Sequence, residues 1–455
     1  MAESHSKTYL FESMPIPGAV AQLAVPMVMS SLVMVLYNLA DTYFVGMLND
    51  PVQNAAVTLV YPIMLAFNAV NNLFGVGTSS MMSRSLGAKD YDKTRTCSSF
   101  GFYGALFSGI LFSVLCILFR LPLLKLLGAD DATFDATYRY FFYTVMLGAT
   151  PSILNVVQAQ MVRSEGSSFH ASIGTMLGCI LNIILDPIFI LPWGLNMGAA
   201  GAGLATLLSN CVACLYFFIL AYAKRGNTFV CLDIRRLKHL DPTVVHGIFG
   251  VGIPASIQNI LNVTGSTILN NFTAGYGPSA VAAMGVAQKI NMIPLQISLG
   301  FGQGIMPLVS YTYANKNFAR MKKSILFALS LIIPVMSVVS VSYWIGAPML
   351  INAFMDNPEI IEYGVHFLRA MCLGIVFLCT DFLAVGVFQA LGKGKTALYF
   401  ALLRKVILEI PLLFLLNHFF KLNGLAYAQS ITEMILAVFS IRVLMGIFRQ
   451  VRQQS

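Results

Sequence analysis

Charged side chains are scarce in this chain. Asp, Glu, Lys and Arg together make up 10% of the 455 residues, whereas 57% of the residues are hydrophobic and the mean hydropathy is +0.76. A soluble globular protein carries about 25% charged residues, so this composition excludes that class. The sequence therefore predicts an integral membrane protein.

Polar and apolar residues do not alternate within the hydrophobic runs. A lipid-facing barrel strand needs alternation, because successive side chains point to the lipid and to the lumen. Continuous apolar runs of about 20 residues instead fit helices that cross a bilayer. We predict an all-α polytopic membrane protein. Residues 1–15 are polar and the first apolar run is long and contains Asp41, so we expect an uncleaved anchor rather than a signal peptide.

Twelve runs are long and apolar enough to span the membrane. They lie at 18–46, 54–83, 97–119, 136–162, 168–192, 198–222, 244–273, 279–310, 324–347, 363–390, 396–417 and 424–447. The net charge is +9, and Lys and Arg gather after the second, sixth, eighth and tenth runs, whereas the opposite loops carry more acids. By the positive-inside rule both termini are cytoplasmic. The basic excess therefore reports orientation and does not indicate a nucleic-acid partner.

Clusters of metal-binding or catalytic side chains are also missing. Cys211 and Cys214 form a C-x-x-C motif, but no second pair or nearby His accompanies them, and the six His residues are dispersed toward the ends of the runs. Asp130 and Asp131 are an isolated pair in a loop. We therefore expect no cofactor and no catalytic residues, and the sequence argues against a membrane enzyme.

The sequence repeats itself at a nearly constant offset. The segment ending at Pro26 resembles the one ending at Pro254, 228 positions later, and the segment ending at Gly77 resembles the one ending at Gly304, 227 positions later. Several matches in one register indicate an internal duplication. Because each half has six spans, both halves enter the membrane in the same sense, and a pseudo-two-fold axis runs along the membrane normal.

The duplication predicts two lobes. We expect an N-lobe at 1–223 with a short cytoplasmic N-terminus, a cytoplasmic linker at 224–242, and a C-lobe at 243–455 with a short cytoplasmic C-terminus. Two similar bundles that rock about a central cavity expose a site to alternate sides of the membrane. Duplication can also simply produce a stable bundle, but this organisation favours a transporter.

An amide and a carboxylate, Asn182 and Asp186, stand in the middle of the fifth span. They are four residues apart and therefore share one face of a helix. Pro187 has no N–H, which leaves a carbonyl about one turn earlier without its helical donor. An ionisable side chain at this depth is expensive and is usually functional. We interpret this stretch as the centre of an ion site.

Three further oxygen-bearing side chains lie in neighbouring spans: Asp41 in the first, Asn155 in the fourth and Thr206 in the sixth. Carboxylate and neutral oxygens suit Na⁺ or a proton, and protonation competes with cation binding. Alone, Asn182 or Thr206 is better explained by helix packing. We predict a Na⁺ or proton site formed by Asp41, Asn182, Asp186 and Thr206.

The second half buries a different set of ionisable groups. Asp381 in the tenth span is a candidate second proton or substrate site. An internal ion pair of Lys289 with Asp381 or Glu409 is the simpler alternative, and Arg404 and Lys405 can snorkel or pair with Glu409. Glu433 also lies in an apolar span and is explained in the same way.

Candidate substrate contacts are harder to assign from sequence. The chain has 23 Met and 33 Phe residues, which suit an adaptable surface for apolar cations but are equally expected on lipid-facing helices. We name Tyr37, Met64, Phe67 and Asn155 as candidates.

Several of these segments resemble the multidrug and toxic compound extrusion (MATE) family, and most closely its MepA-like bacterial branch. The resemblance covers essentially the whole chain and rests on a combination of segments, which are Asp41-Thr42-Tyr43-Phe44-Val45-Gly46, Val162-Arg163-Ser164-Glu165-Gly166, Leu181-Asn182-Ile183-Ile184-Leu185-Asp186-Pro187, Gly203-Leu204-Ala205-Thr206 and Gln389-Ala390-Leu391-Gly392-Lys393-Gly394.

The resemblance implies a twelve-helix, two-lobed antiporter in the bacterial cytoplasmic (inner) membrane. Such proteins export lipophilic organic cations and drugs by coupling to inward movement of Na⁺ or H⁺, and we expect this chain to act as a monomer. The resemblance also implies a cation site at the four positions named above and a bend of the first helix at Pro26. Another branch pairs a glutamate in the seventh span with an aspartate in the tenth; Asp381 matches the aspartate, but the seventh span has no acid.

Two details of the sequence weigh against alternatives. A lipid-linked oligosaccharide flippase of the same superfamily would favour a central cavity rich in cations for pyrophosphate, whereas the cations here lie mostly in loops. In the second half, Ile410 and Phe414 stand where Asn182 and Asp186 stand in the first. We therefore expect this ion site in the N-lobe only.

Overall fold

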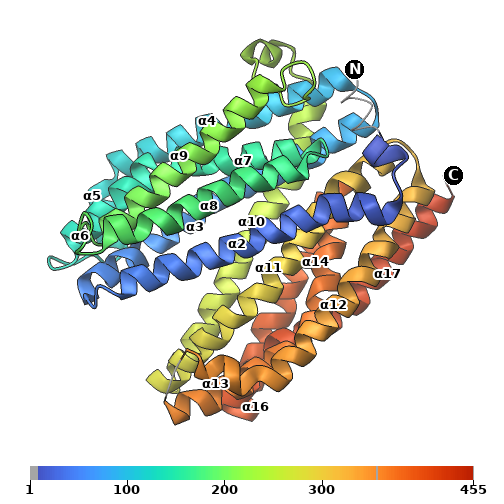
Figure 1. The fold of residues 1–455 in the computed structure, drawn as a ribbon. Coiled ribbons are helices and arrows are strands. Elements are labelled where there is room, and N and C mark those ends of the chain that lie inside the picture. Colours follow the sequence, from blue (N-terminus) through green and yellow to red (C-terminus); the bar gives the residue numbers. More distant parts are fainter. Residues whose placement is uncertain (1–8, 355–356, 454–455) are drawn as a thin grey trace. The chain divides into compact units, whose positions relative to one another are not determined.

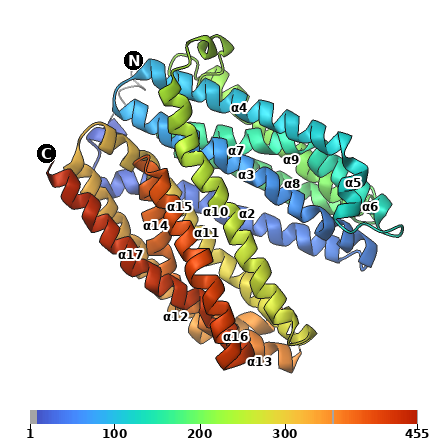
Figure 2. The same cartoon turned by 180° about the vertical axis from the view of Figure 1, so that it is seen from behind.

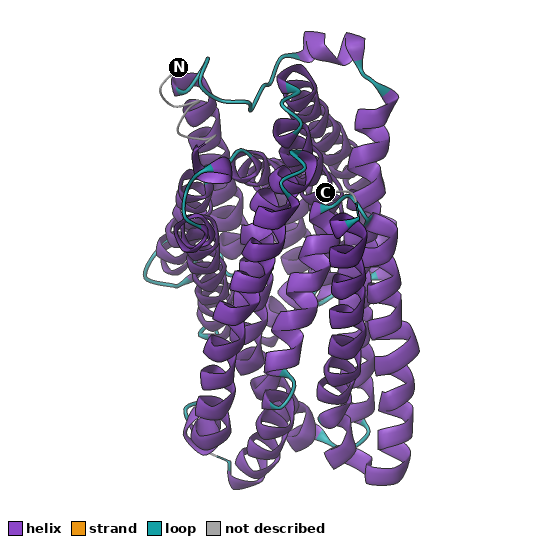
Figure 3. Cartoon of the chain, turned by 90° about the vertical axis from the view of Figure 1, so that its right-hand side faces the viewer, coloured by secondary structure: helices purple, strands orange, loops and turns teal. Residues whose placement is uncertain are grey.

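Every regular element in the described part of the chain is a helix (Figure 3). The structure is a computed structural model that describes residues 9–354 and 357–453. By contact clustering, the chain forms two compact units: a first unit of Met1–Ser13 and Met29–Ser256, and a second unit of Met14–Val28 and Ile257–Ser455. The predicted lobes at 1–223 and 243–455 and the predicted linker at 224–242 stay a prediction.

Two long helices belong partly to each unit. Helix α2 (Ile16–Gly46) contributes its start to the second unit and the rest to the first, and α10 (Pro242–Ala274) does the reverse. Both helices contain an internal proline, Pro26 or Pro254, and in both the division falls two residues after it. A proline removes one backbone hydrogen bond and weakens the helix locally. The bend predicted at Pro26 stays a prediction, because α2 runs through it as one helix.

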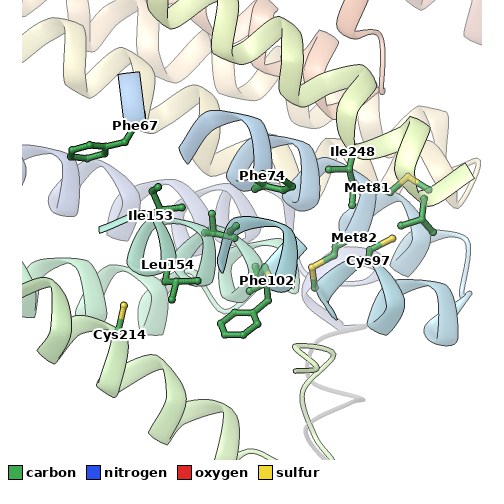
Figure 4. Close-up of a cluster of buried hydrophobic side chains, with 14 of the residues drawn as sticks. Phe67, Phe74, Met81, Met82, Cys97, Phe102, Ile153, Leu154, Cys214 and Ile248 are labelled. Carbon is green, nitrogen blue, oxygen red and sulfur yellow. The ribbon is translucent and has the colours of Figure 1, made fainter. Parts of the chain in front are cut away.

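The first unit is built on six further membrane-length stretches (Figure 1). Helices α3 and α4 both pack on α7, and α8 packs on α9. Phe67, Phe74, Met82, Phe102 and Ile153 fill the centre between α3, α4 and α7 (Figure 4). The elements are α3 (Pro51–Gly87), α4 (Tyr91–Leu118), α5 (Arg120–Leu126), α6 (Phe134–Phe141), the π-helical η1 (Phe142–Leu147), α7 (Ala149–Ser164), α8 (Ser168–Ile190), α9 (Ala199–Ala223) and the 3₁₀-helical η2 (Ile234–His239).

The second unit packs α14 between its neighbours. Helix α14 contacts α11, α12 and α17, and α17 also contacts α16 (Figure 2). The elements are α11 (Pro278–Ala314), α12 (Phe318–Asn352), α13 (Pro358–Cys372), α14 (Ile375–Ala390), α15 (Gly394–Leu402), the π-helical η3 (Leu403–Glu409), α16 (Ile410–Leu425) and α17 (Tyr427–Arg452).

The helices confirm an all-α membrane protein. Within the described residues, nine helices are long and apolar enough to cross a membrane, or up to eleven when each of two bent pairs counts as one span. The pairs bend by 43° and 48° at Gly148 and Gly374, at corresponding places in the two halves. The predicted span at 396–417 falls on α15, η3 and α16, of 9, 7 and 16 residues, because the π-helical turn divides it.

Glycines hold the exchanged helix starts in place. A methyl group on Gly252 of α10 would overlap the backbone carbonyl oxygen of Leu73 in α3, within the first unit. In the second unit, a methyl group on Gly304 of α11 would lie 2.7 Å from Cα of Ala24 in α2. Small residues let helix backbones approach closely in membranes. The repeat therefore explains why Gly304 and Gly252 stand where they do.

This close approach predicts a large effect of one methyl group. Gly252→Ala should lower the thermal stability of the purified protein by about 1–3 kcal/mol, because backbone atoms of α3 must move. Gly250→Ala on the same helix is the matched control, because nothing lies within 4 Å of a methyl group there. Equal melting temperatures for the two variants would contradict the proposed close packing of α3 and α10.

Candidate cation site

The centre of the predicted ion site lies on one buried face of α8. The exposed fractions of Asn182 and Asp186 are 2% and 0%. Helix α8 packs extensively on α9, which carries Thr206, and Asp41 lies on the part of α2 that belongs to the same unit. The first unit therefore contains all four predicted site residues.

Hydrogen bonds join Asn182, Asp186 and Thr206. With its amide nitrogen facing Asp186, Asn182 donates to Asp186 Oδ2 at 2.9 Å. Its amide oxygen then accepts from the Thr206 hydroxyl at 3.2 Å and from the Thr206 backbone N–H at 3.0 Å. The opposite orientation leaves only a 3.2 Å bond from the amide nitrogen to the Thr206 hydroxyl, so the network favours the first. Asn182 therefore presents the Asp186 carboxylate and fixes its position against α9.

Two carboxylate oxygens at this site are buried and lack a partner. Asp41 Oδ1 and Asp186 Oδ1 have no hydrogen-bond partner within the described ranges, and the two side chains lie within electrostatic range of one another. Unpartnered buried carboxylate oxygens are costly, which makes them ligands for a proton or a small cation. No group of three or more His, Cys, Asp or Glu side chains is found in the described residues. Two carboxylates with amide and hydroxyl oxygens fit Na⁺ or H⁺ rather than a transition metal.

Two tyrosines border the same carboxylates. Tyr37, one turn before Asp41, interacts with the Thr206 hydroxyl and with both carboxyl groups. Tyr140 on α6 is 3% exposed, interacts with both carboxyl groups, and its hydroxyl donates to Met64 Sδ at 3.7 Å. The structure thus brings Tyr37 close to the site and links Met64 to it through Tyr140. Sequence reasoning missed Tyr140 because its span gave no pattern that pointed to the fifth.

A chain of amides extends from the site. Asn210, one turn after Thr206, donates to the Thr206 backbone carbonyl at 2.9 Å, and its oxygen accepts from Asn155 Nδ2 at 3.1 Å. Asn155 therefore joins the network through a residue that sequence reasoning did not select. The i, i+4 spacing of Thr206 and Asn210 was the available signal.

The remaining candidates lie elsewhere. Phe67 is 4% exposed and stacks edge-on with Phe112 in the apolar centre, with ring centroids 6.2 Å apart. Asp381 belongs to the second unit, where the Ser440 hydroxyl donates to its Oδ1 at 2.7 Å. Glu409 pairs with Lys405 at 2.6 Å, so its partner is its own neighbour rather than Lys289.

The chain belongs to the MatE family of membrane transporters, because the MatE family model matches residues 26–188 and again 254–415. The two matches begin 228 positions apart, which confirms the internal duplication. Because this is a family of transporters, the membrane-enzyme interpretation is excluded.

Relatives of known name support this placement along the full length. The multidrug export protein MepA of Staphylococcus saprophyticus subsp. saprophyticus is 33% identical over 435 residues, which covers 96% of this chain and 95% of that protein. MepA of Staphylococcus aureus strain NCTC 8325 is 33% identical over 438 residues, with the same coverage. The resemblance to the MepA-like branch is confirmed.

Solved structures show the fold. A multidrug resistance MATE family transporter of the MOP superfamily, in an outward-facing conformation, superposes with a TM-score of 0.91 at 25% identity and covers 98% of this chain and 99% of its own. A MOP superfamily transporter from Pyrococcus furiosus superposes with a TM-score of 0.90 at 25% identity over 98% of both chains, and its binding pocket is described as reversed in polarity. The fold has twelve helices in two lobes. Because polarity differs among such pockets, substrate must be argued from the side chains.

The hydrogen-bond network predicts a specific role for Asn182. Asn182→Leu should reduce transport by about tenfold or more, because Asp186 Oδ2 and the Thr206 groups lose their partner at about 1–3 kcal/mol each. Dye transport by reconstituted protein measures the effect, and the melting temperature checks folding. Asn54→Leu, which replaces an exposed amide at the start of α3, is the control. Transport by Asn182→Leu equal to that of the control would contradict the role.

Proposed function

We propose that this protein is an antiporter that exports lipophilic organic cations and drugs across the bacterial cytoplasmic membrane, driven by inward movement of Na⁺ or H⁺. The observation that carries the proposal is the pair of buried carboxyl groups, Asp41 and Asp186, each with an oxygen that lacks a partner in the described residues. Such a pair changes charge when it takes up or releases an ion, and a charge change in a low-dielectric interior drives a conformational change.

The substrate class follows from the same carboxylates and from the relatives. Proteins that are 33% identical along the chain are named multidrug export proteins. A negatively charged site bordered by Tyr37, Tyr140 and Met64 suits a cation with an apolar body, because aromatic faces and thioethers attract such groups. The four site residues Asp41, Asn182, Asp186 and Thr206 bind the coupling ion in this proposal. The protein works as a monomer, by alternating access of its two similar halves.

The central test is transport in inside-out membrane vesicles. Vesicles that contain the protein should take up an amphipathic cationic dye when a Na⁺ or proton gradient is applied, and Asp41→Asn and Asp186→Asn should each abolish uptake because the site can no longer discharge. Asp131→Asn, a loop carboxylate outside the site, should transport normally. Full uptake by both site variants would refute the mechanism.

The same assay identifies the coupling ion. Each gradient is applied separately, with K⁺ replacing Na⁺ at constant ionic strength. Uptake with the Na⁺ gradient alone assigns Na⁺, and uptake with the proton gradient alone assigns H⁺, because the same oxygens accept either ion. Uptake with neither gradient by the wild type would contradict antiport itself.

Orientation is a separate part of the proposal, with both termini in the cytoplasm. In a variant without the eight native cysteines, Asp131→Cys should react with a membrane-impermeant thiol reagent on intact cells. Asp92→Cys, at an exposed side chain between α3 and α4, should react only after permeabilisation, because the positive-inside rule places that loop in the cytoplasm. The reverse labelling pattern would overturn the topology.

A further inference from the structure

The second unit buries five charged side chains in apolar helices. They come from three elements that pack together, α14, η3 and α17, and their exposed fractions range from 1% to 8%. The five are Asp381, Arg404, Lys405, Glu409 and Glu433. Sequence analysis treated most of them as internal ion pairs, and the pairing in the structure leaves one carboxyl group over.

The two cations are each matched to one acid. Lys405 pairs with Glu409 through both carboxylate oxygens, at 2.6 and 2.7 Å. Arg404 pairs with Glu433 and also lies over the Phe382 ring, 4.5 Å from its centroid. Three carboxyl groups therefore face two cations, and Asp381 has no cation of its own. With every group ionised, the cluster would carry one uncompensated negative charge, which is expensive at this depth.

The geometry shows where the missing positive charge belongs. The Asp381 and Glu433 carboxyl groups lie in hydrogen-bonding contact, and Ser440 satisfies Asp381 Oδ1. The opposite oxygens, Asp381 Oδ2 and Glu433 Oε2, are both buried and have no partner among the described residues. Two carboxyl groups form a hydrogen bond only when one of them carries a proton. One proton would satisfy both oxygens and balance the cluster.

A metal cation fits this place poorly. Arg404 already holds a positive charge against Glu433 and interacts electrostatically with Asp381, so a Na⁺ between the two carboxyl groups would be repelled. The other titratable groups that interact with Asp381 or Arg404 are Glu409 and the neutral thiol Cys379. The π-helical turn η3 places Arg404, Lys405 and Glu409 together on the buried side, and such turns are frequent at functional sites.

We propose that Asp381 and Glu433 share one exchangeable proton beside Arg404, and that this site in the second unit binds H⁺ and excludes Na⁺. The proposal goes beyond the antiporter proposal, which places the coupling ion in the first unit. It rests on that function only for the proton's role in transport, since the proton itself is detected without transport. Loss of the proton leaves a negative cluster, so its binding and release is a second charge switch in the same molecule.

Infrared difference spectroscopy of the full-length protein in lipid tests for the proton. A pH step should reveal the carbonyl band of a protonated carboxylic acid that shifts in D₂O and does not respond to replacing K⁺ with Na⁺. Asp381→Asn and Glu433→Gln should each remove this band. Glu359→Gln, a carboxyl group at the exposed start of α13, should leave it unchanged.

The band should also persist in the Asp41→Asn, Asp186→Asn double variant, which separates this site from the first unit and from failure of transport. A band that survives both Asp381→Asn and Glu433→Gln, or that Na⁺ removes, overturns the proposal.

Charge counting supplies a second measurement that does not depend on spectra. Each single variant, Asp381→Asn or Glu433→Gln, leaves two acids and two cations, so it should fold and yield protein within about twofold of the wild type. Arg404→Gln leaves three acids and one cation and should reduce the yield of folded protein several-fold. Failure of both single carboxyl variants to fold, or normal folding of Arg404→Gln, would contradict the charge balance.

Discussion

The cost of an unbalanced charge inside a bilayer governs both polar clusters in this protein. In the first unit, Asp41 and Asp186 are set among neutral amides and hydroxyls, so their balancing charge must come from a mobile ion. In the second unit, Arg404 and Lys405 supply most of the balance from the chain itself, and a single proton completes it. The same constraint therefore yields a site open to Na⁺ or H⁺ in one unit and a site closed to Na⁺ in the other.

Close backbone packing is what allows these clusters to form. Gly203, three residues before Thr206, leaves room for α9 against η1, because a methyl group there would lie 3.0 Å from Thr144 Oγ1 and 3.2 Å from the Tyr140 carbonyl oxygen. In the second unit, a methyl group on Gly265 would lie 3.0 Å from Lys405 Nζ. In both units, a glycine lets a neighbouring helix approach the polar residues so closely that water is kept out.

Regular spacing made part of the site predictable. The four-residue interval of Asn182 and Asp186 placed both on one face of α8, and composition alone indicated that this face was worth burying. Tyr140 and the pairing of Glu433 with Arg404 were not predictable, because they depend on contacts between helices far apart in sequence. The π-helical turns escaped prediction for a different reason: no residue type demands an i→i+5 hydrogen bond, and packing selects it.

The turn η3 explains why the duplicated halves diverged at this point. Phe414 occupies the sequence position of Asp186, yet it is 58% exposed and stacks edge-on with Phe272, whereas Asp186 is fully buried. A π-helical turn winds more residues into one turn and so rotates everything after it relative to an α-helix. The rotation directs position 414 outward and leaves Arg404, Lys405 and Glu409 buried. A polar residue at 414 would no longer reach the interior, and the charges of the second unit therefore come from one to three turns earlier in the same span.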